Sequence, residues 1–117
     1  MPRHFSRVER VADLIQTTLA GILQEQMKDI QGGMITITSV TVSPDFSHAK
    51  VFVSVLEEEK VPEAIDELNQ AAKHLRHELA HQINLRKTPV LKFIYDDSTV
   101  RGSRISSLIN DALKDSR

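Results

Sequence analysis

The sequence predicts a single α+β domain in which helices pack on a small β-sheet. Apolar residues recur at steps of three and four in the longer segments, as on amphipathic helices. They alternate with polar residues in three short segments, as on half-buried strands. With 117 residues, 40% of them hydrophobic and 26% charged, the chain can bury one core but not two. We therefore expect one domain over residues 1–117.

The first predicted element is a helix that ends near Lys28, because Gly32 and Gly33 then break the pattern. Its apolar stripe consists of Val8, Val11, Ile15, Leu19, Ile22 and Leu23. Residues 34–43 and 49–56 are rich in β-branched side chains, which favours strands. Turn-forming residues separate the two strands, so they should form a hairpin. The apolar positions change parity near Thr38, where we expect a β-bulge or a strand with two apolar sides.

The second half of the chain predicts a long helix, a third strand and a last helix. One apolar stripe indicates a helix that is continuous or nearly so over residues 61–83, with Pro62 in its first turn. Pro89 precedes a strand over residues 90–95. Asp97 or Ser98 is suited to cap the last helix. The core face of that helix would consist of Ile105, Leu108, Ile109 and Ala112.

Charge is segregated along the chain, although the net charge is only −1. Acidic side chains predominate in residues 57–70. Basic side chains predominate in residues 73–104, namely Lys73, Arg76, Arg86, Lys87, Lys92, Arg101 and Arg104. Binding to phosphates requires a local cluster of Lys and Arg rather than a basic total, so this segment is a candidate nucleic-acid surface. The alternative is an ordinary solvated face.

Arg101 and Arg104 stand on either side of Gly102 in the first turn of the predicted last helix. Cations oppose the helix dipole at this end, which favours an anionic partner. Glycine would allow a sugar-phosphate backbone to approach closely. A loop or a frayed turn at Gly102 explains the same residues equally well.

One enzyme motif is present, because residues 77–81 read His-Glu-Leu-Ala-His and match the zinc-binding pattern H-E-x-x-H. A catalytic zinc site needs a third protein ligand, yet no His follows His81 and no Glu follows Glu78. A small zinc hydrolase is thus the weaker alternative, and we expect neither a metal nor a catalytic residue. On the helix defined by Leu75 and Leu79, both histidines should point outward.

The composition also limits where the protein works. There are no cysteines, which excludes disulfides and thiolate metal sites. No apolar run is long enough for a membrane span, and the first residues lack the apolar core of a signal peptide. We therefore expect a cytoplasmic protein.

Taken together, several segments resemble the ribosome-binding factor A family, which comprises bacterial assembly factors of the small ribosomal subunit. The similarity covers nearly the whole chain in order. It is carried by Arg7-Val8-Glu9-Arg10-Val11, the segment 42–55, Leu75-Arg76, Leu85-Arg86-Lys87-Thr88-Pro89, and Asp97-Ser98 through Gly102, Arg104 and Ile109.

The resemblance implies a type II KH-like fold, with a three-stranded sheet packed on helices. The element order would be helix, strand, strand, kinked helix and strand, plus a C-terminal helix. In this family an Ala-x-Gly kink replaces the G-x-x-G loop of other KH domains. The matching residues here are Ala71-Ala72-Lys73, so the absence of glycine predicts a weaker kink, while Lys73 adds a charge.

The resemblance also implies the function and the partner. The protein would bind free 30S subunits and their 16S rRNA, and would support late maturation and 5′-end processing of that RNA, especially in the cold. It would act as a monomer without a cofactor. An interaction module that binds only protein is a further alternative. The expected RNA-binding residues are Arg7, Arg10, Lys73, Arg76, Arg86, Lys87, Lys92, Arg101 and Arg104.

Overall fold

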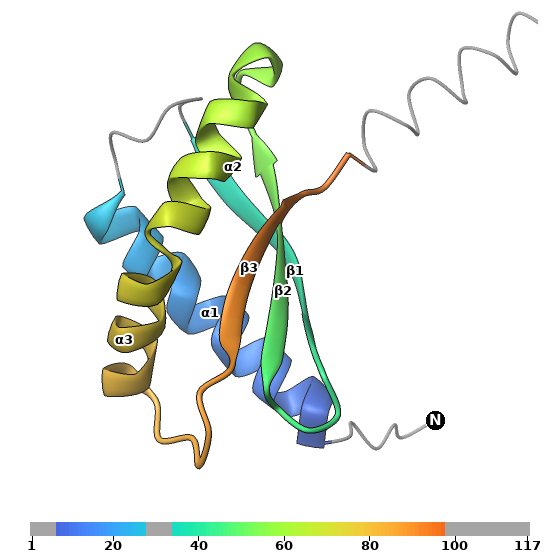
Figure 1. Cartoon of the computed structure of the whole chain (residues 1–117), viewed down its shortest axis with the longest axis vertical. Coiled ribbons are helices and arrows are strands. Elements are labelled where there is room, and N and C mark those ends of the chain that lie inside the picture. Colours follow the sequence, from blue (N-terminus) through green and yellow to red (C-terminus); the bar gives the residue numbers. More distant parts are fainter. Residues whose placement is uncertain (1–6, 28–33, 98–117) are drawn as a thin grey trace, which may run out of the picture.

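The computed structural model describes residues 7–27 and 34–97 of the chain. The elements are α1 (Arg7–Gln26), β1 (Ile35–Val42), β2 (His48–Val55), the 3₁₀ turn η1 (Glu58–Lys60), α2 (Val61–Gln70), α3 (Ala72–Gln82) and β3 (Val90–Tyr95). The strands form one sheet in the order β1-β2-β3, antiparallel between β1 and β2 and parallel between β2 and β3 (Figure 1). This confirms the predicted α+β, KH-like architecture. The predicted last helix lies outside the described residues.

The helices cover one face of the sheet (Figure 1), and the alternation of side chains in β2 shows why. Val51 and Val53 are fully buried, whereas Lys50, which lies between the buried residues Ala49 and Val51, is exposed. Successive side chains of a strand point to opposite faces, so only one face of this sheet is apolar enough to pack on helices. The core below it includes Ile15, Leu19, Leu68, Leu75, Leu79 and Phe93.

The change of parity in β1 is a β-bulge, as predicted. Ile37 pairs with Val53 and Ser39 pairs with Phe52, so Thr38 is the extra residue. The bulge lets apolar side chains on both sides of Thr38 reach the same core. The Thr38 hydroxyl also donates a hydrogen bond to the carboxylate of Asp96, just after β3, at 2.5 Å.

The segment predicted as one helix over residues 61–83 is two helices, with the break at Ala71. Ala71 has φ −87° and ψ −1°, and its N–H is shared between the carbonyl oxygens of Glu67 and Leu68, each at 3.1 Å. Shared hydrogen bonds of this kind are common where a helix ends. The helix is therefore nearly continuous, as expected, and is interrupted at this one residue. The kink that the family resemblance implies is present although no glycine occupies it.

The side chain of Asn69, at the end of α2, hydrogen-bonds the outer side of β3. Its amide nitrogen donates to the carbonyl oxygen of Phe93 at 3.0 Å, and its amide oxygen accepts from the N–H of Phe93 at 2.8 Å. This pair of bonds satisfies both backbone groups of Phe93 where β2 does not reach them. It also ties the end of α2 to β3.

We expect Asn69→Ala to lower the free energy of unfolding by about 1–3 kcal/mol, because it leaves two partly buried backbone groups without partners. Asn69→Asp keeps the acceptor but places a carboxylate oxygen against the Phe93 carbonyl oxygen, so it should lower the free energy of unfolding as well. Urea unfolding followed by circular dichroism measures both. The matched control is Gln70→Ala, which removes only an exposed bond to Asp66. An equal loss in the control would contradict this role for Asn69.

Candidate nucleic-acid interface

A basic hollow lies between α3 and the loop that follows it. It has a volume of about 590 Å³ and is lined by Lys73, Arg76, His77, Ala80, Lys87 and Thr88. The structure thus brings together three of the bases predicted to bind RNA. Lys73 and Arg76 lie on α3, whereas Lys87 lies in the loop between α3 and β3. Cationic side chains around one hollow are suited to bind phosphate. We call this hollow the basic pocket.

Arg76 has a structural role in the basic pocket as well as a charge. Its Nε and Nη2 atoms donate to the carbonyl oxygen of Thr88 at 3.1 and 2.8 Å. Thr88 precedes the buried Pro89, so these bonds hold the end of the loop against α3. Because a guanidinium carries five N–H donors, Arg76 can hold the loop and still bind an anion.

Lys50 and Lys92 form a second cationic pair on the face of the sheet that the helices leave uncovered. They are paired in register on β2 and β3, and both are exposed. Lys92 was among the predicted RNA-binding residues, whereas Lys50 was not. The alternation of β2 already assigned Lys50 to the outer face, but only the pairing of β2 with β3 places it beside Lys92.

The remaining predicted bases within the described residues lie at one end of the molecule. Arg7 and Arg10 are exposed in the first turn of α1, and Arg86 is exposed in the loop between α3 and β3. Both segments are at the lower end in Figure 1, which we call the basic end. Arg101 and Arg104 lie outside the described residues.

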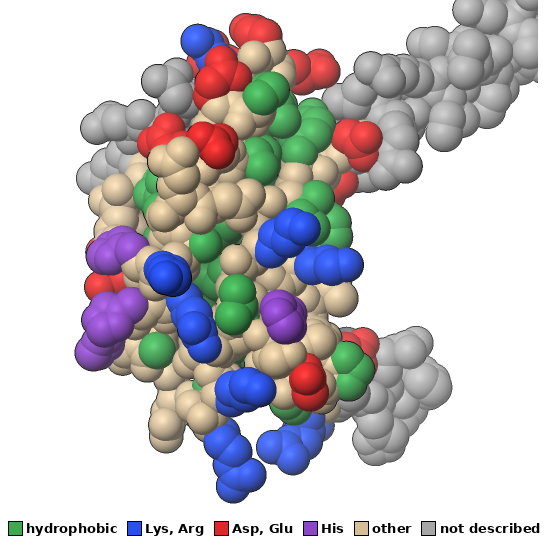
Figure 2. Space-filling model, viewed as in Figure 1, with side chains coloured by type: hydrophobic (Ala, Val, Ile, Leu, Met, Phe, Trp, Pro, Cys, Tyr) green, Lys and Arg blue, Asp and Glu red, His purple; other side chains and the backbone are tan. Residues whose placement is uncertain are grey.

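Acidic side chains gather at the opposite end, as Figure 2 shows. They belong to η1 and to the start of α2, where Glu58, Glu59 and Glu63 are exposed. The charge segregation of the sequence is therefore a segregation in space. A polyanion would meet attraction at one end of the molecule and repulsion at the other.

Asp45, in the hairpin turn at the basic end, uses its carboxylate to hold that turn. It accepts hydrogen bonds from the Ser47 hydroxyl at 2.6 Å, the Ser43 hydroxyl at 2.8 Å and the Ser47 N–H at 3.1 Å. The bond from the Ser47 side chain, followed by that from Ser43, holds the pKa of Asp45 well below its usual range, and the charge of Lys87 adds to this. The turn also holds Phe46 at a φ of +61°.

We expect Asp45 to make the fold sensitive to acid. Its pKa is depressed in the folded state, so it contributes stability above its unfolded pKa of about 3.9, and this contribution is lost as the pH falls further toward the folded pKa. Thermal unfolding recorded from pH 6 down to pH 2 should therefore show a shallower decline for Asp45→Asn than for the wild type. Asp13→Asn, on an exposed position of α1, is the control and should decline like the wild type. Identical slopes for all three proteins would contradict the assignment.

The H-E-x-x-H motif does not form a hydrolase site within residues 7–27 and 34–97. His77 and His81 are exposed, as predicted, with their Nε2 atoms 3.1 Å apart. The Glu78 carboxylate accepts a hydrogen bond from Gln26 of α1 at 3.1 Å, so it packs α3 against α1. In this part of the chain no third His, Cys, Asp or Glu joins the pair in a metal-binding geometry. The arrangement that a catalytic zinc requires is not assembled there.

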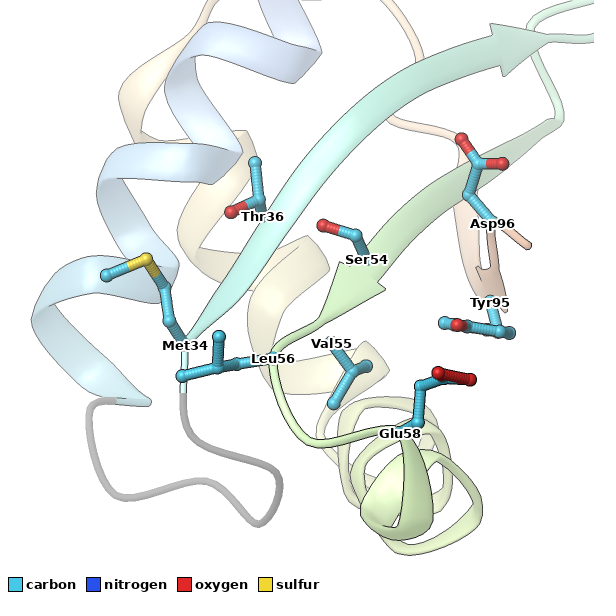
Figure 3. A pocket seen from close by; sticks show the side chains of 8 residues that line it. All are labelled: Met34, Thr36, Ser54, Val55, Leu56, Glu58, Tyr95 and Asp96. Atoms are coloured by element: carbon cyan, nitrogen blue, oxygen red, sulfur yellow. The ribbon is translucent and has the colours of Figure 1, made fainter. Parts of the chain in front are cut away.

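A second hollow, of about 340 Å³, lies at the acidic end of the sheet (Figure 3). Its apolar rim includes Met34 and Leu56, which are 70% and 73% exposed. Glu58 and Asp96 also line it, and their carboxylates would repel phosphate. This hollow is therefore unsuited to RNA, in contrast to the basic pocket.

Comparison with known proteins gives one consistent result. The family model for ribosome-binding factor A matches residues 7–109. A ribosome-binding factor A from Azoarcus sp. (strain BH72) is 44% identical over 116 residues, which cover 98% of this chain and 92% of that protein.

Two solved structures are similar in fold as well. The crystal structure of ribosome-binding factor A from Thermus thermophilus matches with a TM-score of 0.68 and 26% identity, over 77% of this chain and 97% of that one. A Thermus thermophilus homology model fitted into a cryo-EM map of a complex between the 30S subunit and ribosome-binding factor A matches with a TM-score of 0.63 and 26% identity, over 74% and 91% of the chains. Among the described residues of this chain, no helix has the length and apolar character needed to cross a membrane.

Proposed function

Because the chain belongs to the ribosome-binding factor A family, we propose that it binds the free 30S subunit and contacts 16S rRNA through its basic end. The observation that carries this proposal is the basic pocket, where Lys73, Arg76 and Lys87 converge. The Lys50–Lys92 pair extends the positive surface across the sheet. The fit of the Thermus thermophilus relative into a 30S complex supports the same partner.

Recognition rests on the charge and shape of folded RNA. A G-x-x-G loop clamps a nucleic-acid backbone because glycine allows close contact, and the side chains of Ala72 and Lys73 at the kink prevent such an approach. Long Lys and Arg side chains instead reach phosphates from a distance. The protein thus reads the arrangement of RNA helices rather than four unpaired bases.

The biological role that we propose is late maturation of the small subunit. Reversible binding to 16S rRNA stabilises one arrangement of a precursor helix and supports 5′-end processing. This binding matters most in the cold, when misfolded RNA persists longest. In this role the whole chain acts as one ribosome-binding domain, as a cytoplasmic monomer without catalytic residues. Its release follows displacement by another factor or by subunit joining.

The binding proposal predicts a steep dependence on salt. About five phosphate contacts release enough counterions to give a slope of about −4 in a plot of log affinity against log salt, so a fourfold rise in salt should lower affinity about 250-fold. Sedimentation of the purified protein with free 30S subunits at several salt concentrations measures this slope. Binding that is independent of salt and persists after nuclease treatment would instead show a module that binds only protein.

The maturation proposal is tested in cells that lack the protein. Precursor 16S rRNA with an unprocessed 5′ end should accumulate, more strongly at low temperature than at the optimum, and primer extension measures the fraction. Wild-type protein should restore processing, whereas a variant with a neutralised basic pocket should not. Normal 5′ ends at every temperature would overturn this role even if the protein binds 30S subunits.

A further inference from the structure

The histidine pair on α3 is the feature that the proposed RNA-binding role leaves unused. We propose that His77 and His81 form a binding site for a divalent transition-metal ion, with Zn²⁺ as the probe of choice. The site is distinct from a catalytic zinc centre, because it has two protein ligands and no associated general base. It is independent of whether the protein binds RNA.

The geometry of the two rings supports this assignment. Their Nε2 atoms are 3.1 Å apart, and the rings are nearly perpendicular, at 78°, with centroids 4.4 Å apart. In tetrahedral coordination each ligand nitrogen lies about 2.0–2.1 Å from zinc, which places two such nitrogens about 3.3 Å apart. The observed separation of the two Nε2 atoms is therefore close to the one that a shared zinc ion requires. The helix supplies the spacing, since residues four positions apart lie on the same face.

Neighbouring groups leave this pair available. Gln26 of α1 engages the other two candidate ligands on α3: its amide donates to Glu78 at 3.1 Å, and its oxygen lies 2.7 Å from Nε2 of His74. Those two side chains are therefore used to pack α3 against α1. Within the described part of the chain, the rings of His77 and His81 contact each other, and both side chains are exposed to solvent.

The surroundings determine how strong the site can be. His77 also lines the basic pocket beside Lys73, Arg76 and Lys87, whose charges oppose a cation. With two imidazole ligands, the remaining coordination positions are left to water or to an anion attracted by those bases. The structure thus assigns a reversible site, weaker than a structural zinc centre with four protein ligands.

Titration with ZnCl₂ followed by calorimetry tests the proposal on the whole chain. We expect one saturable equivalent, and His77→Gln or His81→Gln should each lower the association constant at least about tenfold, the loss that removing even an outer-shell partner of a metal causes. The chain has five histidines. The other three therefore give matched controls, and His4→Gln, His48→Gln and His74→Gln should bind like the wild type.

Two further measurements keep the test independent of folding. Circular dichroism should show unchanged helix content in both pair variants, since the two side chains are exposed. Free zinc at about 100 times its dissociation constant should raise the folding equilibrium constant about 100-fold in the wild type and have a much smaller effect in the variants. Absence of saturable binding, or binding that survives His77→Gln and His81→Gln, would overturn the proposal.

Discussion

Replacement of Arg86 and Lys87 together by alanine should weaken binding to free 30S subunits about 40-fold at 0.1 M salt. Each phosphate contact contributes about 0.8 to the salt slope, so the loss of two contacts removes about 1.6 from log affinity at this concentration. The slope itself should become shallower by the same amount. Both side chains are exposed, so the midpoint of thermal unfolding should stay nearly unchanged.

The control for this double variant is Lys60→Ala, which removes a positive charge at the acidic end, in η1. Its binding should equal that of the wild type, because a phosphate surface at the basic end does not reach it. Wild-type affinity in the Arg86→Ala, Lys87→Ala protein would exclude this loop from the interface. A loss of stability equal to the loss of binding would show that the two side chains are structural.

Truncation of Phe93 should have the largest effect on stability. The side chain is only 1% exposed and lies in β3 between the sheet and the helices. Phe93→Ala removes a large buried surface and leaves a cavity, at a cost of about 3–5 kcal/mol. Because a domain of this size has a total stability of about 5–15 kcal/mol, the variant should lose a large share of it and unfold at a clearly lower urea concentration than the wild type.

Urea unfolding of Phe93→Ala beside Lys92→Ala measures this difference. Lys92 is the preceding residue of the same strand but is exposed on the opposite face, so its truncation should change the free energy of unfolding by less than about 0.5 kcal/mol. The same Lys92→Ala protein should bind 30S subunits less tightly. Phe93→Ala would then lower stability, whereas Lys92→Ala would lower binding without lowering stability. Similar stabilities of the two variants would contradict the packing described for β3.

The elements themselves could be predicted from the sequence, because each has a periodic pattern of its own. The strand over 90–95 has the bounds observed for β3, and the parity change at Thr38 is a β-bulge. The break at Ala71 could not be predicted from the apolar stripe, because the stripe continues from Leu68 to Leu75 and alanine favours helices. Only the family resemblance implied a kink there. Helical periodicity indicates which side chains are buried, and α2 and α3 bury the same apolar stripe on either side of the kink.

The site was less predictable, since it depends on residues distant in the sequence. The charge pattern predicted Lys73, Arg76 and Lys87 as RNA-binding residues, and the structure brings all three into one pocket. The charge pattern did not reveal that Arg76 also donates hydrogen bonds to the Thr88 carbonyl oxygen. Lys50 was missed because its pairing with Lys92 depends on the parallel register of β2 and β3.

The bonds between Asn69 and Phe93 have a consequence for how this sheet can associate with other chains. The unpaired side of a terminal strand is a template for strand addition, both by partner peptides and in aggregation. At β3 the Asn69 amide already occupies the donor and acceptor in the middle of that strand. A ribosomal or identical chain that approaches β3 must therefore displace Asn69 before it can extend the sheet there, so this side of the protein favours contacts through side chains over exchange of strands.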